Sequence, residues 1–301
     1  MNKDILNNIS NPSVFEENRL PAHSDHRVYA NKSELLKGSS SLCCSLNGVW
    51  KFDYSINLNC TPDGFEALDY DCKNWDDIRV PAHIQMEGYD RPHYANVAYP
   101  WDGRQSLKSG EAPTDFNPVG SYVKYFTLPK NFLKESLILR FEGVESAAAI
   151  WLNGHYIGYC EDSFTPSEFD LTKYIVEGEN KLAIQVTKWC AGSWLEDQDF
   201  FRFSGIFRDI YLYTKPKCHL EDIEIKQVFE KGSFDNVKLN LSIDLSNNAN
   251  VALKLFDAMD LTLKSNEFKV FDEMPVVYET VTNLHSGKNE LSFDVAAPKL
   301  W

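Results

Sequence analysis

The sequence has few of the features that mark zinc, redox or membrane proteins. None of its seven cysteines forms a CxxC pair, and no histidine is followed by another four positions later. This excludes the common zinc and dithiol motifs. Ala147–Leu152 is about the longest apolar run, far shorter than the roughly 20 residues of a membrane-spanning helix. Positive charge is scarce as well, with 30 Lys and Arg against 44 Asp and Glu and a net charge of −14. We therefore expect neither a nucleic-acid nor a membrane partner.

Motifs for nucleophilic or nucleotide chemistry are missing too. Ser204 is followed by Gly205 but does not stand in a GxSxG elbow, and Gly103, Gly110 and Gly120 do not form a phosphate loop. The odd number of cysteines indicates reduced thiols. The first eight residues contain no apolar segment of a secretory signal. Together these features predict a cytoplasmic protein.

What is present indicates a folded protein of two domains. The chain has 301 residues, 43% of them hydrophobic and 25% charged, which are ordinary globular values. Residues 1–40 are polar and show no sustained period, so we interpret them as an arm that packs onto another part of the structure. Residues 41–216 form the first predicted domain and 217–301 the second.

Short β-type segments follow one another through the first domain, separated by turn signals such as Asn153-Gly154. This spacing, without long helical patterns, predicts an all-β sandwich or jelly roll. One capped helical turn is predicted at Asp170–Ile175. The Pro-rich stretch Tyr89–Pro118 is long for a loop in a compact domain, and we expect it to bind a ligand or a partner. The predicted strands are Val49–Tyr54, Ser121–Leu128, Ser136–Phe141, Ala147–Leu152, His155–Tyr159, Lys181–Lys188 and Phe207–Tyr213.

The second domain also has strand patterns. Val237–Leu245 is apolar at every second position, which predicts a half-buried antiparallel strand. Further strands are predicted at His219–Val228, Val251–Phe256 and Glu290–Val295. The number of predicted strands is one or two fewer than a complete immunoglobulin-like sandwich has. The large aromatic Trp301 at the end of the sequence further suggests that this domain is truncated.

Two acidic clusters allow a hydrolase interpretation without requiring it. Glycoside hydrolysis needs two carboxyl groups about 5 to 9.5 Å apart, but sequence neighbours on a strand point to opposite faces. We interpret Glu161-Asp162 with Glu168 and Asp170 as solvated turns and an N-cap. Glu196–Asp199 lies among aromatic residues and Arg202, a setting that suits a sugar. Spacing alone identifies no catalytic residue.

Several strings together resemble the amino-terminal part of the large bacterial β-galactosidases of glycoside hydrolase family 2. They cover roughly residues 15–216, whereas residues 217–301 are similar mainly in strand pattern and in Pro298–Trp301. The strings are Glu17–Leu20, Ala22-His23, Ser45–Phe52, Val80–Asp90, Tyr94–Pro100, Trp151–Gly154, Gly158-Tyr159, Asp162-Ser163, Pro166–Leu171, Gly178–Asn180, Leu195–Asp199 and Phe203–Asp209.

The resemblance implies a jelly-roll sugar-binding domain followed by an immunoglobulin-like domain. In the family a TIM barrel then carries both catalytic glutamates. Because this chain has no counterpart of that barrel, we expect it to be inactive alone, with no catalytic residue of its own. Asn96 matches a residue whose amide contacts the sugar, and Asp199 matches a carboxylate that contacts galactose and a sodium ion. The sodium site is incomplete here, so we expect it to bind weakly. No cofactor is expected for this fragment, whereas sodium and magnesium are implied for the full-length enzyme.

Three alternatives stay open. The chain supplies sugar-binding and linker domains to a β-galactosidase, or it is an autonomous galactoside-binding module, or its arm assembles subunits and complements a truncated partner. The implied partners are a β-galactoside, the missing barrel and a second copy of the chain.

One departure from the family is Ala191, where relatives usually carry an Asp before Gly192-Ser193. We expect this change to remove a side chain that stabilises the turn. For Asn96 the alternative is a turn residue that bonds its own backbone. We expect Trp194 and Glu196 to form an exposed contact surface for the barrel.

Overall fold

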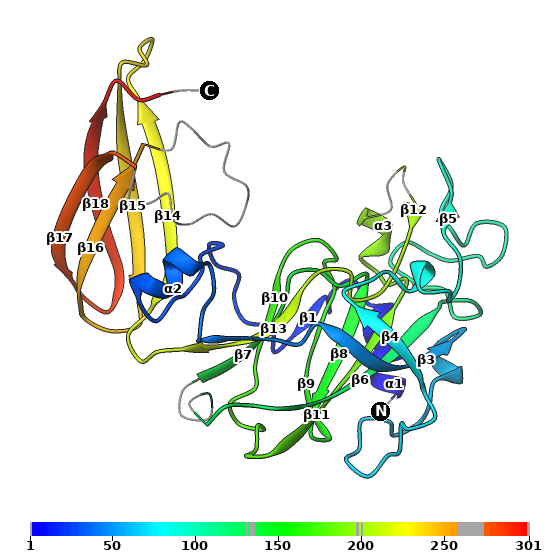
Figure 1. The fold of residues 1–301 in the computed structure, drawn as a ribbon. Coiled ribbons are helices and arrows are strands. Elements are labelled where there is room, and N and C mark those ends of the chain that lie inside the picture. Colours follow the sequence, from blue (N-terminus) through cyan, green and yellow to red (C-terminus); the bar gives the residue numbers. More distant parts are fainter. Residues whose placement is uncertain are drawn as a thin grey trace. The chain divides into compact units, whose positions relative to one another are not determined.

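The computed structural model describes residues 2–130, 132, 136–196, 199, 201–257 and 274–299. The chain forms two compact units. The first unit consists of the chain up to Pro21 and of Cys43–Thr214, and the second consists of Ala22–Leu42 and the chain from Lys215 onward (Figure 1). The segment predicted as an arm, residues 1–40, is thus divided between both units. It also contains two helices that its irregular pattern did not predict, α1 (Asn2–Ile9) and α2 (Lys32–Lys37).

The first unit contains a seven-stranded antiparallel sheet and a four-stranded sheet. The order in the large sheet is β1-β9-β8-β11-β6-β3-β4, and that in the small sheet is β10-β7-β13-β2. In chain order the strands are β1 (Glu16–Glu17), β2 (Cys43–Ser45), β3 (Gly48–Ser55), β4 (Asp76–Val80), β6 (Val119–Thr127), β7 (Ser136–Phe141), β8 (Ala147–Leu152), β9 (His155–Cys160), β10 (Ser167–Asp170), β11 (Glu179–Thr187) and β13 (Ile210–Lys215). Each strand predicted in this domain overlaps one of these elements.

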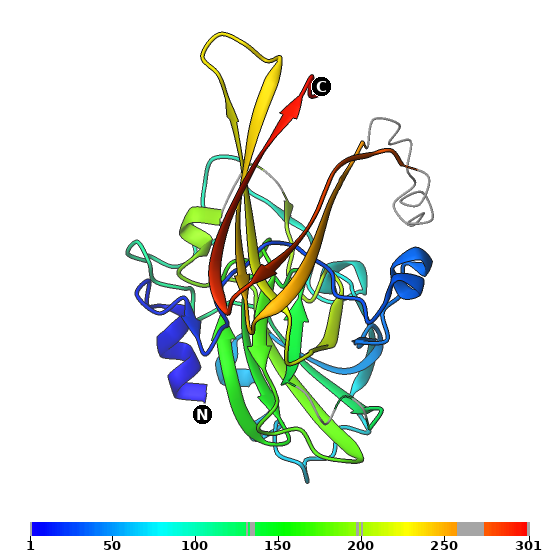
Figure 2. The same cartoon turned by 90° about the vertical axis from the view of Figure 1, so that its left-hand side faces the viewer.

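The two sheets pack face to face around one core. Trp50 and Tyr122 from the large sheet share a buried cluster with Leu139 and Phe169 from the small one. The opposite face of the large sheet is covered as well: Ile5 and Ile9 of α1 and residues of the 58–75 loop pack there. Figure 2 shows the helix at the N-terminus beside the strands. Strand β8 is therefore buried on both faces, which explains its unbroken apolar sequence.

The Asn153-Gly154 turn joins β8 to β9, as predicted. Both residues have positive φ, 53° and 82°, which a two-residue type I′ hairpin turn requires and which Asn and Gly tolerate best. The Asn153 side chain fixes the turn by donating to the Tyr174 carbonyl and accepting from the Lys181 N–H, both at 2.9 Å.

The capped helical turn predicted at Asp170–Ile175 is present as one hydrogen-bonded turn, which is too short to be a regular helix. Asp170 ends strand β10, and the structure assigns no helix there, only a turn in which the Ile175 N–H donates to Leu171. The Asp170 carboxylate does accept from the Thr172 N–H at 2.8 Å, so the local capping chemistry is present without a helix.

The second unit is a small β-sandwich. Its core joins residues of a three-stranded and a two-stranded sheet, including Ile243 and Leu284. Burial alternates along β15, as its sequence predicted. Strand β17 had not been predicted. The strands are β14 (Leu220–Phe229), β15 (Asn236–Leu245), β16 (Ala249–Phe256), β17 (Val276–Leu284) and β18 (Gly287–Ala296). Leu300 and Trp301, which suggested truncation, lie outside the described residues. None of the helices in the described ranges is long and apolar enough to cross a membrane.

Candidate functional site

A two-residue antiparallel ladder brings together the two loops that carry the predicted site residues. Strand β5 (His93–Tyr94) pairs with β12 (Phe201–Arg202), with Tyr94 opposite Phe201 and His93 opposite Arg202. Asn96 follows β5 by two residues, and Asp199 precedes β12 by two. Both site residues are exposed, so this edge of the first unit presents them to solvent.

Side chains from both strands connect the loops. The Tyr94 hydroxyl donates to Oδ1 of Asp199 at 2.6 Å. Nη2 of Arg202 donates to the carbonyl of Ala95 at 3.3 Å. Arg202 is buried, so its guanidinium holds the backbone directly before Asn96. No pattern in the sequence indicated these roles, although Tyr94 begins one of the strings that carry the resemblance and Arg202 directly precedes another.

Asn96 and Asp199 do not bond each other. Neither the side-chain nitrogen nor the side-chain oxygen of Asn96 makes a hydrogen bond with a described residue. The Asp199 carboxylate has one oxygen bonded by Tyr94. Each residue therefore retains polar atoms that a hydroxyl-rich ligand could contact. Asp197 and Gln198 of the predicted acidic cluster lie outside the described residues.

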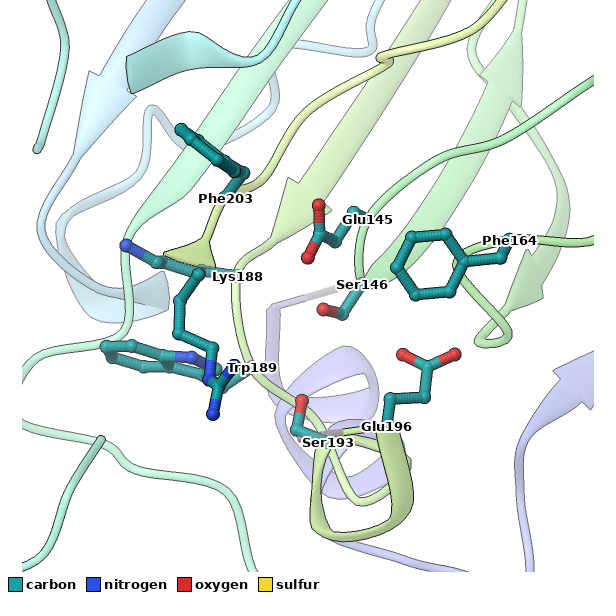
Figure 3. Close-up of a pocket in the computed structure, with 9 residues that line it drawn as sticks. Glu145, Ser146, Phe164, Lys188, Trp189, Ser193, Glu196 and Phe203 are labelled. Atoms are coloured by element: carbon teal, nitrogen blue, oxygen red, sulfur yellow. The ribbon is translucent and has the colours of Figure 1, made fainter. Parts of the chain in front are cut away.

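A small pocket, partly open to solvent, lies next to this ladder (Figure 3). Its walls combine aromatic rings with charged and hydroxyl side chains. The lining residues are Glu145, Ser146, Phe164, Lys188, Trp189, Ser193, Glu196, Arg202 and Phe203. This mixture of a few polar groups on an apolar lining is typical of small-molecule sites.

Glu145 has the most perturbed carboxyl of this pocket. Burial, followed by repulsion from Glu196, raises its pKa to about 8, although Lys188 and Arg202 counteract the rise. His83 lies nearby, with Nδ1 3.7 Å from Oε2 of Glu145. Burial lowers the pKa of His83, and its ring stacks on Phe207. At neutral pH both groups therefore favour their uncharged forms.

Lys188 is held by a buried network. Its ammonium lies 2.5 Å from Oδ2 of Asp90, which also accepts from the Gln85 amide at 3.0 Å. Gln85 in turn bonds Ser204 through both its amide nitrogen and its oxygen, at 3.0 Å each. These bonds hold Ser204 in place, two residues after Arg202.

The first acidic cluster agrees with our interpretation only in part: Asp170 is exposed and caps its turn, and Asp162 is half-buried, but the two glutamates are not solvated. Glu161 and Glu168 are both buried. Glu168 is bonded by Arg140 at 3.0 Å and by the Tyr213 hydroxyl at 2.8 Å. The sequence pattern missed this because the partners come from distant strands. Both glutamates stabilise the fold, and neither lines the pocket.

Glu161 also explains why the turn at Ala191 is ordered. Its carboxylate accepts from the Gly192 N–H at 2.8 Å and from the Tyr159 hydroxyl at 2.8 Å. The Ser193 hydroxyl accepts from the Cys190 N–H at 3.0 Å. Glu161, which directly follows strand β9, and Ser193 therefore stabilise the turn. They compensate for the stabilising side chain that we expected to be lost at Ala191.

Trp194 and Glu196, at the start and end of α3 (Ser193–Glu196), are engaged within the first unit. The Trp194 Nε1–H donates to the Glu111 carbonyl at 2.8 Å, and its ring packs against Tyr99 and Trp101. Glu196 accepts from both the N–H and the hydroxyl of Ser163. Trp194 itself is therefore half-buried, not exposed as we had expected. The exposed apolar side chains nearby are Tyr94, Val97, Leu195 and Phe201.

Among the described residues, no further carboxylate, histidine or cysteine joins Asp199 in a group that could bind a metal. The part of the chain that the structure describes holds no group of three or more His, Cys, Asp or Glu side chains able to bind a metal. Asp199 supplies a single carboxylate, and one of its oxygens is already bonded by Tyr94. Sodium ordinarily needs several oxygen ligands, as other hard cations do. The described residues therefore do not fit a resident cation on their own.

The fold and the site define a two-unit β-sandwich protein with an exposed polar edge beside a small pocket. Residues 43–216 match the sugar binding domain of glycosyl hydrolases family 2. The chain belongs to this family, and its residues 43–216 are a sugar binding domain.

Relatives and solved structures agree with this assignment. A β-galactosidase of Halalkalibacterium halodurans is 46% identical over 96% of this chain and 28% of its own length. A β-galactosidase large subunit of Latilactobacillus sakei is 47% identical over 71% of this chain and 36% of its own length. The chain thus spans roughly a quarter to a third of these two relatives. A Bifidobacterium dentium β-glucuronidase shares the fold, with a TM-score of 0.60 and 18% identity over 87% of this chain and 43% of that one.

Proposed function

We propose that this chain is the sugar-binding and linker portion of a β-galactosidase, with Asn96 and Asp199 contributing to a galactoside site that a catalytic domain completes. The ladder between β5 and β12 is the observation that supports this best, because it places both residues on one exposed edge with polar atoms available. The relatives named as β-galactosidases support the choice of substrate.

Within this proposal the Asn96 amide would hydrogen-bond a sugar hydroxyl, and Asp199 would accept from another. Hydrogen bonds of this kind orient a substrate but do not cleave its glycosidic bond. The two catalytic glutamates of the retaining mechanism would come from outside these 301 residues. Asp199 as a sodium ligand, and any magnesium, would likewise require oxygen ligands beyond those that the described residues group together.

A chimera tests the proposal. This chain would replace the matching 294-residue segment of the Halalkalibacterium halodurans β-galactosidase. We expect the chimera to hydrolyse o-nitrophenyl β-galactoside and the isolated chain to show no turnover. Asp199→Asn should lower kcat/KM by about 10- to 100-fold, the size of a hydrogen bond to a charged group, and Asn96→Ala by about 2- to 10-fold, the size of a neutral one.

The matched control is Asp63→Asn, an exposed carboxylate elsewhere on the first unit, which should leave kcat/KM unchanged. The proposal is wrong if the isolated chain hydrolyses the substrate, or if both site variants behave like the control in an active chimera. Calorimetric heat from millimolar galactose on the isolated chain would instead favour an autonomous binding module. Recovery of activity on mixing with a separate barrel fragment would favour the complementing role.

A further inference from the structure

A buried arginine from the strand that follows Asp199 bonds the backbone directly before Asn96. Arg202 is 5% exposed, and its Nη2 donates to the Ala95 carbonyl at 3.3 Å. In the ladder between β5 and β12 it lies opposite His93, three residues before Asn96. Arg202 therefore contacts the loop of Asn96 at the point where this loop leaves the sheet.

A second bond holds the other end of the same loop. The Tyr99 hydroxyl donates to the Trp194 carbonyl at 3.2 Å, and the Tyr99 ring packs against the rings of Trp101 and Trp194. Residues 96–98, between the two bonds, are all exposed, and Val97 is 99% exposed. We call residues 96–98 the tip. It is attached to the first unit at both of its ends.

Both bonds come from residues that flank Asp199 in the sequence. Trp194 precedes Asp199 by five residues, and Arg202 follows it by three. Asp199 itself is bonded separately, because it accepts from the Tyr94 hydroxyl at 2.6 Å. Loss of the Arg202 bond should therefore displace the tip without releasing Asp199.

The shape of the guanidinium matters for this contact. A guanidinium presents its donors in a rigid plane, whereas a lysine ammonium is a compact point charge on a flexible stem. Arg202 is followed by Phe203, whose ring lies 4.6 Å from that of His83, and by Ser204, whose N–H donates to Gln85 at 3.0 Å. These contacts fix the backbone from which the guanidinium extends. A lysine at this position would keep the positive charge but lose the directed bond to the loop.

We propose that Arg202 is a positioning residue for the galactoside site: its guanidinium holds the Ala95 carbonyl and thereby orients the Asn96 amide toward a sugar hydroxyl, while Tyr99 holds the other end of the tip. The effect on the sugar rests on the proposed function, whereas the order of the tip does not. Arg202 acts through Asn96 and does not touch the sugar. Its replacement should therefore reduce activity by no more than the loss of the Asn96 bond does.

Backbone relaxation of the isolated, isotope-labelled chain tests the positioning without substrate. The amides of Ala95 and Val97 should have order parameters near the rigid value of about 0.85, and Arg202→Lys should lower both below about 0.6, the range of flexible backbone. Arg19→Lys is the matched control, because the Arg19 side chain is 10% exposed and its Nη2 donates to the Pro166 carbonyl at 3.0 Å. This control should leave both order parameters unchanged. Equal order parameters in Arg202→Lys and in the unmodified chain would overturn the proposal.

Double substitutions in the chimera test whether Arg202 acts through Asn96. Arg202→Lys should lower kcat/KM by about 2- to 10-fold, as Asn96→Ala does, and should have no further effect in the Asn96→Ala background. In the Asp199→Asn background the loss from Arg202→Lys should persist, because Tyr94 bonds Asp199 separately. An equal loss from Arg202→Lys with and without Asn96→Ala would indicate general damage to the fold and would contradict the proposal.

Failure of the proposed function is recognised separately. If Asn96→Ala leaves the chimera fully active, Asn96 does not contact the sugar and the proposed function fails, but the order parameters still decide whether Arg202 holds the tip. If Arg202→Lys does not fold, two other measurements decide. An order parameter below about 0.6 at Ala95 in the unmodified chain would overturn the proposal. Tyr99→Phe, which removes only the hydroxyl bond, should lower the order parameter of Val97, and no change there would also overturn it.

Discussion

The Tyr94 hydroxyl donates a 2.6 Å hydrogen bond to Oδ1 of Asp199 and thereby joins the two loops of the candidate site. This bond, with the negative charge of Asp199, raises the pKa of Tyr94, because it stabilises the protonated phenol. Asp199→Asn should therefore lower the pKa of Tyr94 toward the ordinary tyrosine value of about 10. An NMR titration of the tyrosine rings between pH 8 and pH 12 measures this. Tyr89, whose pKa is raised to about 12 by burial and by Asp76, serves as an internal control that should not move. An unchanged Tyr94 pKa in the variant would show that the two side chains are not bonded in solution.

Glu145 predicts an unusual dependence of stability on pH. Its pKa is about 8 in the folded chain and about 4.5 when exposed. Below pH 4.5 both states are protonated, so the group has no effect. Between pH 4.5 and pH 8 the unfolded chain loses the proton first, so the free energy of unfolding falls and then levels off above pH 8. Glu145→Gln removes this loss, which is on the order of a few kcal/mol. Urea unfolding of the variant and of the unmodified chain measures this at pH 5 and pH 8.5. The gain in the free energy of unfolding from Glu145→Gln should be larger at pH 8.5 than at pH 5, and the control Glu177→Gln should show no such difference. Parallel stability profiles for the Glu145 variant and the unmodified chain would contradict a raised pKa.

The sequence predicted the strands well where one local pattern determines the outcome. The alternation in β15 and the Asn153-Gly154 turn between β8 and β9 depend on side-chain period and backbone φ alone, and both were confirmed. Helix α1 could not be predicted in this way. It is eight residues long, too short to be stable from its own propensity, and it is held by packing of Ile5 and Ile9 on the large sheet.

The candidate site was less predictable, for a similar reason. The motifs identified Asn96 and Asp199, but they could not show that Tyr94 and Arg202 connect the two loops, since these contacts join residues about 105 positions apart. Of the residues that line the pocket, Glu196 and Arg202 had been singled out in the sequence, but no pattern indicated Glu145. A carboxyl becomes perturbed through burial and neighbouring charge, and both arise only when the distant strands pack together.

Glu168 provides a test of the buried acidic cluster. Its carboxylate bonds Arg140 and Tyr213, and the side chains of Arg140 and Glu168 are each only 6% exposed. Glu168→Ala would leave the Arg140 charge buried with fewer partners, so we expect a loss of about 3 kcal/mol in the free energy of unfolding. Glu177→Ala removes an exposed pair with Lys130 and should cost less than about 1 kcal/mol. Urea denaturation at pH 7 compares the two. Similar small losses would mean that Glu168 is solvated, as the sequence alone had suggested.

Two isoleucines test the sandwich of the second unit. Ile243 of β15 is 1% exposed, whereas Ile225 on the neighbouring strand β14 is 56% exposed. Replacing each with Ala removes the same atoms, but only at Ile243 does this leave a cavity in the core. Ile243→Ala should therefore lower the free energy of unfolding of this unit by about 2 to 5 kcal/mol, and Ile225→Ala by less than about 1 kcal/mol. Hydrogen exchange of the β15 amides reports on this unit specifically. If the two substitutions accelerated that exchange equally, the Ile243 side chain would not lie in a packed core.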